Sequence, residues 1–399
     1  MWPRWPPRAT PSRVRRQPVV AVVPTGDEVR PVGAVLAPGE VLDTNSLMLA
    51  GMVEETGGKA LRLPIAPDRP DQIAAAVVQA AESADVVLVI AGSSAGRGDH
   101  TATVVRRLGR TAVHGVAMRP GHPVLLGVLS GHRPVPVGVP GYPASAERTF
   151  TCFVGPLLRR LLARGRSARE EGIPARLGCT VSSAEHLDEY VRLRLARIID
   201  PRTGREGLVA IPLPRGAGAL NTMVQTEAVL RIPAGANGFA AGAEIQPIPI
   251  AGAAFATATT IISGLRSPAT DALLELRREE TPRGSVHWTE FGVQDASNAL
   301  ATGLCHAVAL AQDHDADGGT ADPIGGLIAR VGEVTVIEIA RTGSTSDVLV
   351  VPALAFDSQP ITALRAVLRS TAFQRRLLEC DGYSGRSAGR ETWHGPNAQ

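Results

Sequence analysis

The sequence predicts an α/β protein in three parts, and three observations lead to this fold class. From Pro18 to about Arg166, short apolar strands alternate with helical patterns, as in a mostly parallel sheet covered by helices. From about Arg176 to Ile250, short alternating segments broken by Gly and Pro predict a small antiparallel sheet or barrel. From about Thr259, strands and helices alternate again.

The first part can be assigned element by element. The continuously apolar run "PVVAVVP" predicts a buried strand. The helix "DTNSLMLAGMVEETGG" has Asp43, Thr44 and Asn45 as N-cap candidates and Gly57 at its end. We then expect the strand "KALRLPI", the helix "PDQIAAAVVQAAESA", the strand "DVVLVI", the helix "HTATVVRRLG" and the strand "PVPVGV". A Pro/Gly loop leads from there into one long helix that ends near Arg166.

The last part is predicted in the same way. Strands are expected at "TTIISG", "SVHWTEFG" and "VTVIEIA", and helices at "ATDALLELRREE" and in "ASNALATGLCHAVAL". Ser297 and Asn298 are expected near the start of the second helix, where they could bind a small anion or serve as caps.

Composition excludes several classes of protein. With 399 residues, of which 44% are hydrophobic and 20% charged, the chain is long enough for two or three globular domains. The net charge of +3 and the lack of a basic and aromatic stripe argue against a nucleic-acid partner. Basic charge is almost all arginine, with Lys59 as the one lysine, and arginine suits phosphate and other oxyanions.

The cellular setting is predicted to be the cytoplasm. The four cysteines are scattered without a C-x-x-C pair, which favours a reducing compartment. No apolar run approaches the roughly 18 residues of a membrane span, and residues 1–17 lack the apolar core of a signal peptide. We therefore expect residues 1–17 to be a disordered arm and the protein to have no membrane partner.

Three loops follow predicted strands and carry polar or flexible residues. They are "TGDE" (25–28), "AGSSAGRGDH" (91–100) and "PGYPASA" (140–146). Ligands of open α/β sheets bind outside the carboxyl ends of the strands, so we expect these loops to meet at one edge. Glycine-rich turns expose backbone N–H groups that bind anions. Ser93, Ser94 and Gly96 are candidate donors.

Carboxylates beside an anion site call for a cation between them. Asp99 and Glu28, with Asp27, are therefore candidate Mg²⁺ ligands that share the ion with phosphate oxygens. In "MRPGHP", Arg119 and His122 are candidate clamps for an oxyanion. Each feature has a structural alternative: "TGDE" as a plain turn, Asp99 as a helix cap, "PGYP" as a rigid connection. From the residues alone, the prediction is an anionic, phosphorylated small-molecule ligand.

Four ordered motifs carry a resemblance to a known family. "VVAVVPTGDEVRPVGAVLAPGEVLDTNSLMLAGMVEETGG", "AGSSAGRGDHT", "VAMRPGHPVLLG" and "VPGYPASAERTF" resemble the molybdopterin-binding domain of molybdopterin molybdenumtransferase. "SSAEHLDEYVRLRLARI" and "PLPRGAGALNTMVQTEAVLRIP" are similar to that family's small C-terminal barrel. From about Thr259, the segments "DASNALATGLCHAVAL" and "LLECDGYSGRSAG" resemble part of a periplasmic-binding-protein-like domain. The resemblance implies a three-layer α/β domain over 18–166, a barrel over 172–250 and a partial binding-protein-like domain over 259–393.

The resemblance also implies an enzyme of molybdenum cofactor biosynthesis. This transferase would combine adenylylated molybdopterin with molybdate and release AMP, with Mg²⁺ assisting. Its catalytic residues would be Asp99, Glu28 and Arg119, with the metal on Asp99, Glu28 and Asp27. The residues implied for binding the molybdopterin substrate are Thr25, Gly26, Gly92, Ser93, Ser94, Gly96, His122, Pro140, Gly141, Tyr142 and Ser145.

The chain departs from the family pattern in three ways. The usual "KPGKP" is "RPGHP" here, so Arg119 keeps a charge that His122 keeps only when protonated. The usual "PGNP" is "PGYP". The resemblance implies two N-terminal domains that complete the family's active site across a dimer, and we expect the short basic arm of residues 1–17 in their place. We expect a homodimer, with other proteins of cofactor biosynthesis as further partners.

Alternative functions stay open. The chain could hold molybdopterin without converting it and need a partner chain, or it could sense molybdate through its last domain. A related module adenylylates molybdopterin on the same fold.

Overall fold

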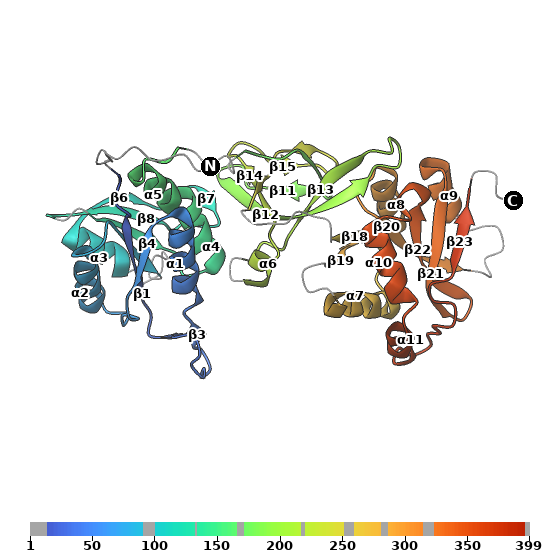
Figure 1. The fold of residues 1–399 in the computed structure, drawn as a ribbon, viewed down its shortest axis with the longest axis horizontal. Coiled ribbons are helices and arrows are strands. Elements are labelled where there is room, and N and C mark those ends of the chain that lie inside the picture. Colours follow the sequence, from blue (N-terminus) through green and yellow to red (C-terminus); the bar gives the residue numbers. More distant parts are fainter. Residues whose placement is uncertain are drawn as a thin grey trace, which may run out of the picture.

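The computed structural model describes residues 14–90, 100–131, 134–165, 171–216, 220–250, 259–280, 286–313 and 323–395. Three sheets with their helices lie in a row along the long axis of the molecule (Figure 1). Within the described ranges, no helix is both long and apolar enough to cross a membrane. The four cysteines are all described, and none forms a disulfide.

The first unit is built on a six-stranded sheet in the order β4-β1-β5-β9-β8-β6. The pairs β4–β1, β1–β5 and β5–β9 are parallel, and β9–β8 and β8–β6 are antiparallel. This confirms a mostly parallel sheet. The strands are β1 (Val19–Pro24), β4 (Lys59–Arg62), β5 (Val86–Ile90), β6 (Gly109–His114), β8 (Leu125–Leu129) and β9 (Val135–Val139).

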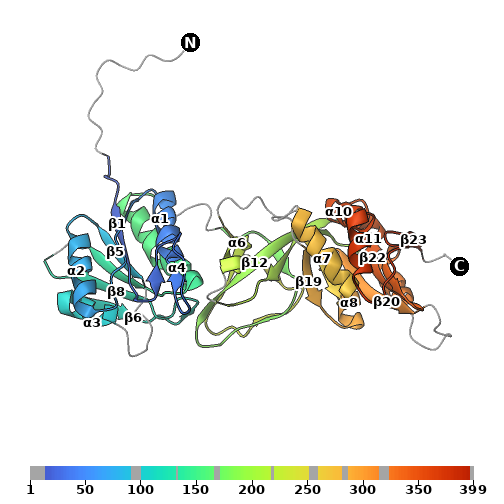
Figure 2. The same cartoon turned by 90° about the horizontal axis from the view of Figure 1, so that it is seen from below.

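Helices cover both faces of this sheet and give three layers, which Figures 1 and 2 show from two directions. Alternate residues of β1 explain why both faces are covered. Val20 and Val22 pack in one apolar cluster with α1, α4 and α5, whereas Ala21 and Val23 pack in another with α2 and α3. The helices are α1 (Thr44–Thr56), α2 (Pro70–Ala81), α3 (His100–Leu108), α4 (Pro143–Thr149) and α5 (Gly155–Leu161).

Local signals at α1 behave as predicted. The Asp43 carboxylate accepts a hydrogen bond from the Ser46 N–H at 3.0 Å, which makes Asp43 the N-cap. Gly57 ends the helix at φ 99°, a left-handed conformation that favours glycine. The expected long helix after β9 forms as well, but a π-helical segment, Phe150–Val154, separates α4 from α5.

Several strands of the first unit were not predicted. β6 and β8 form the antiparallel edge of the sheet, and the short β7 (Met118–Arg119) leaves the first sheet altogether. A two-stranded ribbon, β2 (Val29–Arg30) with β3 (Val41–Leu42), follows β1. Residues 14–17, which the sequence assigned to a disordered arm, contact this unit: Arg16 forms an ion pair with Asp85, and the Gln17 amide donates to the Gly58 carbonyl at 3.1 Å.

The second unit is a β-sheet in which β7 also takes part. Its pairing path is β16-β10-β13-β12-β14-β17, with β7 beside β12 and a separate β11–β15 ribbon. The predicted small barrel is matched in part, because this path is open among the described residues. The elements are β10 (Ala175–Leu177), β11 (Val181–Ser182), β12 (Asp188–Ile199), β13 (Glu206–Pro212), α6 (Leu220–Val224), β14 (Ala228–Ile232), β15 (Gly238–Phe239), β16 (Glu244–Ile245) and β17 (Ile248–Pro249).

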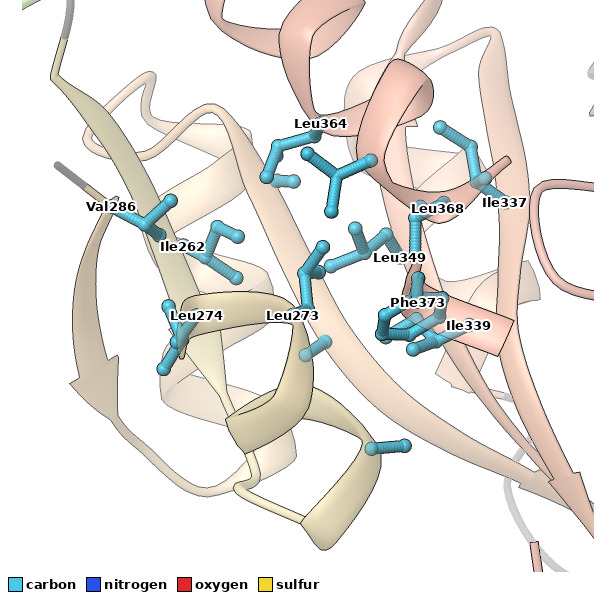
Figure 3. Close-up of a cluster of buried hydrophobic side chains, with 14 of the residues drawn as sticks. Ile262, Leu273, Leu274, Val286, Ile337, Ile339, Leu349, Leu364, Leu368 and Phe373 are labelled. Atoms are coloured by element: carbon cyan, nitrogen blue, oxygen red, sulfur yellow. The ribbon is translucent and has the colours of Figure 1, made fainter. Parts of the chain in front are cut away.

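The third unit has a six-stranded mixed sheet in the order β19-β18-β20-β22-β21-β23. One face packs on α7, α10 and α11 in the apolar cluster of Figure 3, where Leu273, Leu364 and Phe373 lie close together. The elements are β18 (Thr260–Gly264), α7 (Pro268–Glu280), β19 (Val286–Glu290), α8 (Val293–Ala301), β20 (Ala307–Asp313), α9 (Pro323–Val331), β21 (Val334–Thr342), β22 (Thr345–Pro352), the 3-10 turn Ala353–Ala355, α10 (Gln359–Leu368), α11 (Thr371–Leu378) and β23 (Glu391–His394).

One prediction in the third unit is wrong. Ser297 and Asn298 do not begin a helix, because α8 starts at Val293 with Gly292 as its N-cap. Ser297 is buried inside the helix, and the Asn298 side-chain oxygen accepts a hydrogen bond from Arg330. Neither residue is therefore placed as a cap or as an anion ligand at a helix start.

The second and third units share a hydrophobic core. Ala196, Ile198, Val209 and Ile211 of β12 and β13 pack in one cluster with residues of β18, α8, β20, α9, β21 and β22. Polar contacts reinforce this junction. Arg176 donates to the carbonyls of Thr302 and Gly303 at 2.6 and 2.7 Å. Because the two units bury apolar surface against each other, they pack as one continuous body.

Candidate functional site

The strands that precede the three predicted site loops end side by side. Pro24 of β1 pairs with Ile90 of β5, and Ile90 pairs with Val139 of β9. All three strands are parallel, so their carboxyl ends lie at the same edge of the first sheet. The structure thus confirms that the strands before all three predicted loops end at a common edge.

The first of these loops is tied tightly to the sheet. The Thr25 N–H and hydroxyl both donate to the Ile90 carbonyl, at 3.1 and 2.9 Å, and the side chain is buried. Gly26 donates to the Ala66 carbonyl at 3.2 Å and has a φ of 138°, which an L-residue rarely adopts. Thr25 therefore has a structural role, and Gly26 allows the chain to turn toward the acidic residues.

Asp27 and Glu28 follow on the surface of this edge. The Asp27 carboxylate accepts a hydrogen bond from the Asp68 N–H at 3.1 Å, which brings a third acidic residue to the same place. The Asp68 Oδ1 atom is buried and has no hydrogen-bond partner among the described residues. Oxygen donors of this kind suit Mg²⁺. Within the described ranges, no cluster of three or more His, Cys, Asp or Glu side chains is arranged as a metal site.

The second loop contains five predicted site residues that lie outside the described residues. They are Gly92, Ser93, Ser94, Gly96 and Asp99. Their roles remain predictions.

The third loop lies against the start of α1. The Asn45 side-chain amide donates to the Gly141 carbonyl at 2.6 Å across a separation of 96 residues. Pro140 is buried, whereas Tyr142 is exposed and stands at the N-cap position of α4. Ser145 is buried one turn later. The described residues of the first and third loops thus lie at the same edge of the sheet. Asn45 connects the start of α1 to the third loop through its hydrogen bond to Gly141.

Arg119 is positioned by β7 and not by the first sheet. β7 pairs in parallel with β12, so that Arg119 lies opposite Glu189 and Met118 opposite Asp188. His122 is exposed, and its Nδ1 atom is 2.7 Å from the Val116 carbonyl, which fixes an Nδ1–H tautomer. The motif "MRPGHP" therefore spans the boundary between the first two units.

Arg119 lines a cavity of ≈ 330 Å³ between these units. The first unit supplies Arg119, Pro120 and Ser145, and the second supplies Glu189, Tyr190, Arg192, Leu213, Pro214 and Arg215. Three arginines against one carboxylate make the lining positive. Glu189 accepts a hydrogen bond from Arg215 at 3.0 Å, which leaves Arg119 and Arg192 as the remaining cations of the lining.

Arg192 is held in place by main-chain oxygens. Its Nη2 donates to the carbonyls of Pro214 and Gly216 at 3.1 and 2.9 Å. Burial lowers the pKa of Arg192 below its usual value; the nearby Glu147 raises it and the nearby Arg148 lowers it further. An arginine stays charged under such shifts, so the cavity keeps a cation with few competing partners.

A larger cavity of ≈ 1120 Å³ lies between α1, the π-helical segment and the second sheet. It holds none of the sequence-predicted site residues, and acidic and basic side chains are mixed in its lining. Tyr190 lines both cavities, and the Arg148 guanidinium lies 4.7 Å above its ring centroid. We assign the site to the smaller cavity because cations dominate only there.

Sequence reasoning missed two residues of the smaller cavity, Arg192 and Arg215, and two residues at the rim of the first sheet, Asn45 and Asp68. Asn45 was read only as a helix cap. Asp68 stands in "APDRP", which looks like a plain turn. Arg192 sits in "YVRLRLARI", where alternating arginines are typical of the solvated face of a strand. No local signal distinguishes these residues, because their role depends on pairing between distant segments.

Comparison with known proteins agrees with this arrangement. Residues 21–160 match the model described as "Probable molybdopterin binding domain", and residues 174–250 match "MoeA C-terminal region (domain IV)". The first two units therefore carry a probable molybdopterin-binding domain and a MoeA C-terminal domain, and relatives similar to these regions are named molybdopterin molybdenumtransferases. The two matched regions meet at the cavity that holds Arg119 and Arg192.

Individual relatives cover part of their own length. A molybdopterin molybdenumtransferase of Nostoc sp. is 34% identical over 157 residues, which are 38% of this chain and 36% of that protein. One from Synechococcus elongatus is 28% identical over 230 residues, covering 57% and 54%. The crystal structure of a molybdopterin biosynthesis MoeA protein from Pyrococcus horikoshii has a TM-score of 0.50 at 32% identity and covers 59% of this chain and 55% of that one. The chain thus spans about half the length of these molybdopterin molybdenumtransferase relatives, or less.

Proposed function

We propose that the chain acts in molybdenum cofactor biosynthesis as a transferase that inserts molybdate into adenylylated molybdopterin and releases AMP. The observation that carries the proposal is the positive cavity between the first two units. Arg119 and Ser145 from one unit and Arg192 and Arg215 from the other line it together. Guanidinium groups bind oxyanions through charge-assisted hydrogen bonds.

The residues divide the work between two places. Arg119 and Arg192 bind the oxyanion in the cavity, and Ser145 offers a hydroxyl beside them. The rim at the ends of β1, β5 and β9 binds the phosphate part of the substrate. Its described residues are Gly26, Gly141 and Tyr142. The sequence after β5 would add Gly92, Ser93, Ser94 and Gly96. We also place the exposed His122, near this junction, among the residues that bind the phosphate part. Held donors of this type stabilise negative charge that develops on the phosphate as AMP leaves.

We propose that Mg²⁺ binds at the acidic side of the rim, where Asp99 would have to complete a group of carboxylates that the described residues alone do not form. Asp27 and Glu28 are exposed, and Asp68 has a buried carboxylate oxygen without a partner among the described residues. These oxygens, with Asp99 from the loop after β5, would hold the ion. When bound, Mg²⁺ neutralises phosphate charge. We propose Asp99 and Glu28 as catalytic residues, with Arg119.

The alternative is a binding protein that holds molybdopterin and needs a partner chain. Two facts favour it. The comparisons cover about half the length of the relatives or less, and the sequence resemblance implies lysines where this chain has Arg119 and His122. A homodimer, contacts with other proteins of cofactor biosynthesis and a cytoplasmic location are part of the proposal. A molybdate-sensing role for the third unit, which resembles part of a periplasmic-binding protein, is the weaker alternative.

An assay of AMP release separates these functions. We expect the purified chain to release AMP from adenylylated molybdopterin only when molybdate and Mg²⁺ are both present. Asp99→Asn should abolish this release while most of the substrate affinity remains. The substitution replaces a charged ligand of Mg²⁺ with a neutral amide and leaves the contacts to the pterin unchanged. Binding without release in the wild type would support the binding protein. Release that continues unchanged in Asp99→Asn would contradict the assigned role of Asp99.

A further inference from the structure

Asn45 differs from the other rim residues because only one of its two side-chain amide atoms, Nδ2, has a hydrogen-bond partner among the described residues. It lies in the first turn of α1 and is 9% exposed. The Nδ2 group donates to the Gly141 carbonyl at 2.6 Å, whereas the Oδ1 atom is buried without a partner among the described residues. The orientation of the amide is fixed, because a carbonyl can only accept and therefore faces the NH₂ group.

The hydrogen bond to Gly141 fixes the direction of a peptide group. The Gly141–Tyr142 peptide is trans, since the one cis bond in the described residues is Arg119–Pro120. In a trans peptide the C=O and the N–H point in opposite directions. The Tyr142 N–H is thus turned away from Asn45, and no described residue accepts a hydrogen bond from it. This donor belongs to the loop itself and not to the first turn of α4.

The unpartnered Oδ1 atom is the second observation. Buried polar atoms in native proteins almost always have a hydrogen-bond partner, so an exception calls for an explanation. A side chain kept only for stability would have both ends of its amide satisfied, or would be apolar. The position of Asn45, between the end of β9 and the start of α1, is the rim where the phosphate part of the substrate is placed above.

We propose that Asn45 is a positioning residue: it holds the Gly141–Tyr142 peptide so that the Tyr142 N–H is presented to a phosphate oxygen of the ligand. This inference rests on the proposed function and adds a residue to its binding rim. Asn45 does not touch the reacting atoms in this account. Its loss therefore affects ligand affinity and leaves the chemical step alone.

Calorimetry with adenylylated molybdopterin and Mg²⁺ on the full chain tests the assignment. We expect Asn45→Ala to weaken binding about tenfold, the size of one hydrogen bond to a charged group. Asn45→Asp should weaken it further, because a carboxylate repels the Gly141 carbonyl. AMP release at saturating substrate should keep its rate, so KM changes and kcat does not. The exposed Asn237→Ala serves as the matched control and should bind like the wild type.

Two further readouts separate positioning from stability. The melting temperature of Asn45→Ala should stay close to that of the wild type, because the substitution removes an unsatisfied acceptor together with one hydrogen bond. The Tyr142 amide NMR signal should move in Asn45→Ala and should shift on ligand binding in the wild type only. Equal affinity in wild type and both variants overturns the assignment of Asn45 alone. No binding even by the wild type overturns the proposed function and this inference with it.

Discussion

Arg119 lies opposite Glu189 in the parallel β7–β12 pair, so a residue from the sequence of the first unit is part of the sheet of the second. β12 also carries Arg192, and Arg119 and Arg192 line the same cavity. The β7–β12 pairing therefore sets the position of this cavity. The junction between the two units is therefore built from main-chain hydrogen bonds. Its geometry does not depend on side-chain contacts alone.

Removing either cavity arginine should weaken oxyanion binding. We expect Arg119→Gln and Arg192→Gln each to raise the Kd for molybdate about tenfold or more, since charge-assisted hydrogen bonds contribute about 1.5–3 kcal/mol. Titration calorimetry with molybdate measures the change. The control is Arg197→Gln, which removes an exposed arginine that pairs with Glu206 at 2.9 Å. If Arg197→Gln weakened binding as much as Arg192→Gln, a general loss of charge would explain the result and the cavity would not.

Asp68 should contribute to Mg²⁺ affinity. Asp68→Asn keeps the shape of the side chain and removes its charge beside Asp27, so we expect the Mg²⁺ concentration for half-maximal AMP release to rise about tenfold. Activity at saturating Mg²⁺ should recover. The exposed Asp71→Asn, whose carboxylate pairs with Arg107 at 2.7 Å, provides the matched control. An unchanged Mg²⁺ requirement in Asp68→Asn would remove Asp68 from the metal site.

His306 should make the junction between the second and third units sensitive to acid. Its Nδ1 accepts from the Ile261 N–H at 2.9 Å, and its Nε2 lies 2.9 Å from the Arg197 carbonyl, so the ring is neutral and bridges the two units. Burial lowers the pKa of His306 from 6.5 to about 4, and its two main-chain hydrogen bonds act in the opposite direction. Burial and the charge of Arg194 also lower the pKa of His287 to about 4.

The sign of the effect follows from these directions. In the unfolded chain His306 is protonated below about pH 6.5, whereas in the folded chain it stays neutral down to about pH 4. The free energy of unfolding therefore falls as the pH drops from 6.5 to 4. Between pH 7.5 and 5.0 we expect His306 to account for a loss of about 2 kcal/mol. Chemical unfolding of wild type and His306→Asn at both pH values measures it. His306→Asn should have a lower free energy of unfolding than the wild type at pH 7.5 and should lose less of it between pH 7.5 and 5.0. An equal loss in both proteins would contradict this role of His306.

Arg176 should stabilise the same junction. Besides its two bonds to the Thr302 and Gly303 carbonyls, it lies 3.5 Å from the Asp200 carboxylate. We expect Arg176→Ala to lower the free energy of unfolding by about 2–3 kcal/mol, because two part-buried carbonyls lose a charged donor. Arg202→Ala removes a more exposed partner of the same Asp200 and should cost about 0–1 kcal/mol. Urea unfolding measures the loss of unfolding free energy in both variants. An equal loss in Arg176→Ala and Arg202→Ala would show that Arg176 acts through Asp200 and not through the junction.

The sequence predicted the elements that carry a strong local signal. The runs 19–24 and 86–90 are continuously apolar and form buried central strands, and Asp43 and Gly57 bound α1 as cap residues do. Arg119 and Ser145, which line the smaller cavity, could be predicted as candidate site residues because they stand in recognisable motifs. Arg192, Arg215 and Asn45 could not, because β12 had to be paired with β7 and α1 had to be placed against Gly141 first. The start of α8 was misplaced because Gly292 caps it with no side-chain hydrogen bond to reveal it.

One calorimetric experiment tests the central claim most directly. Adenylylated molybdopterin and Mg²⁺ are titrated into the purified chain, molybdate is then added, and AMP is measured in the same samples. The account predicts binding in the first step and AMP release in the second. The absence of any binding by the wild-type chain would contradict the phosphate-binding rim and, with it, the proposed function.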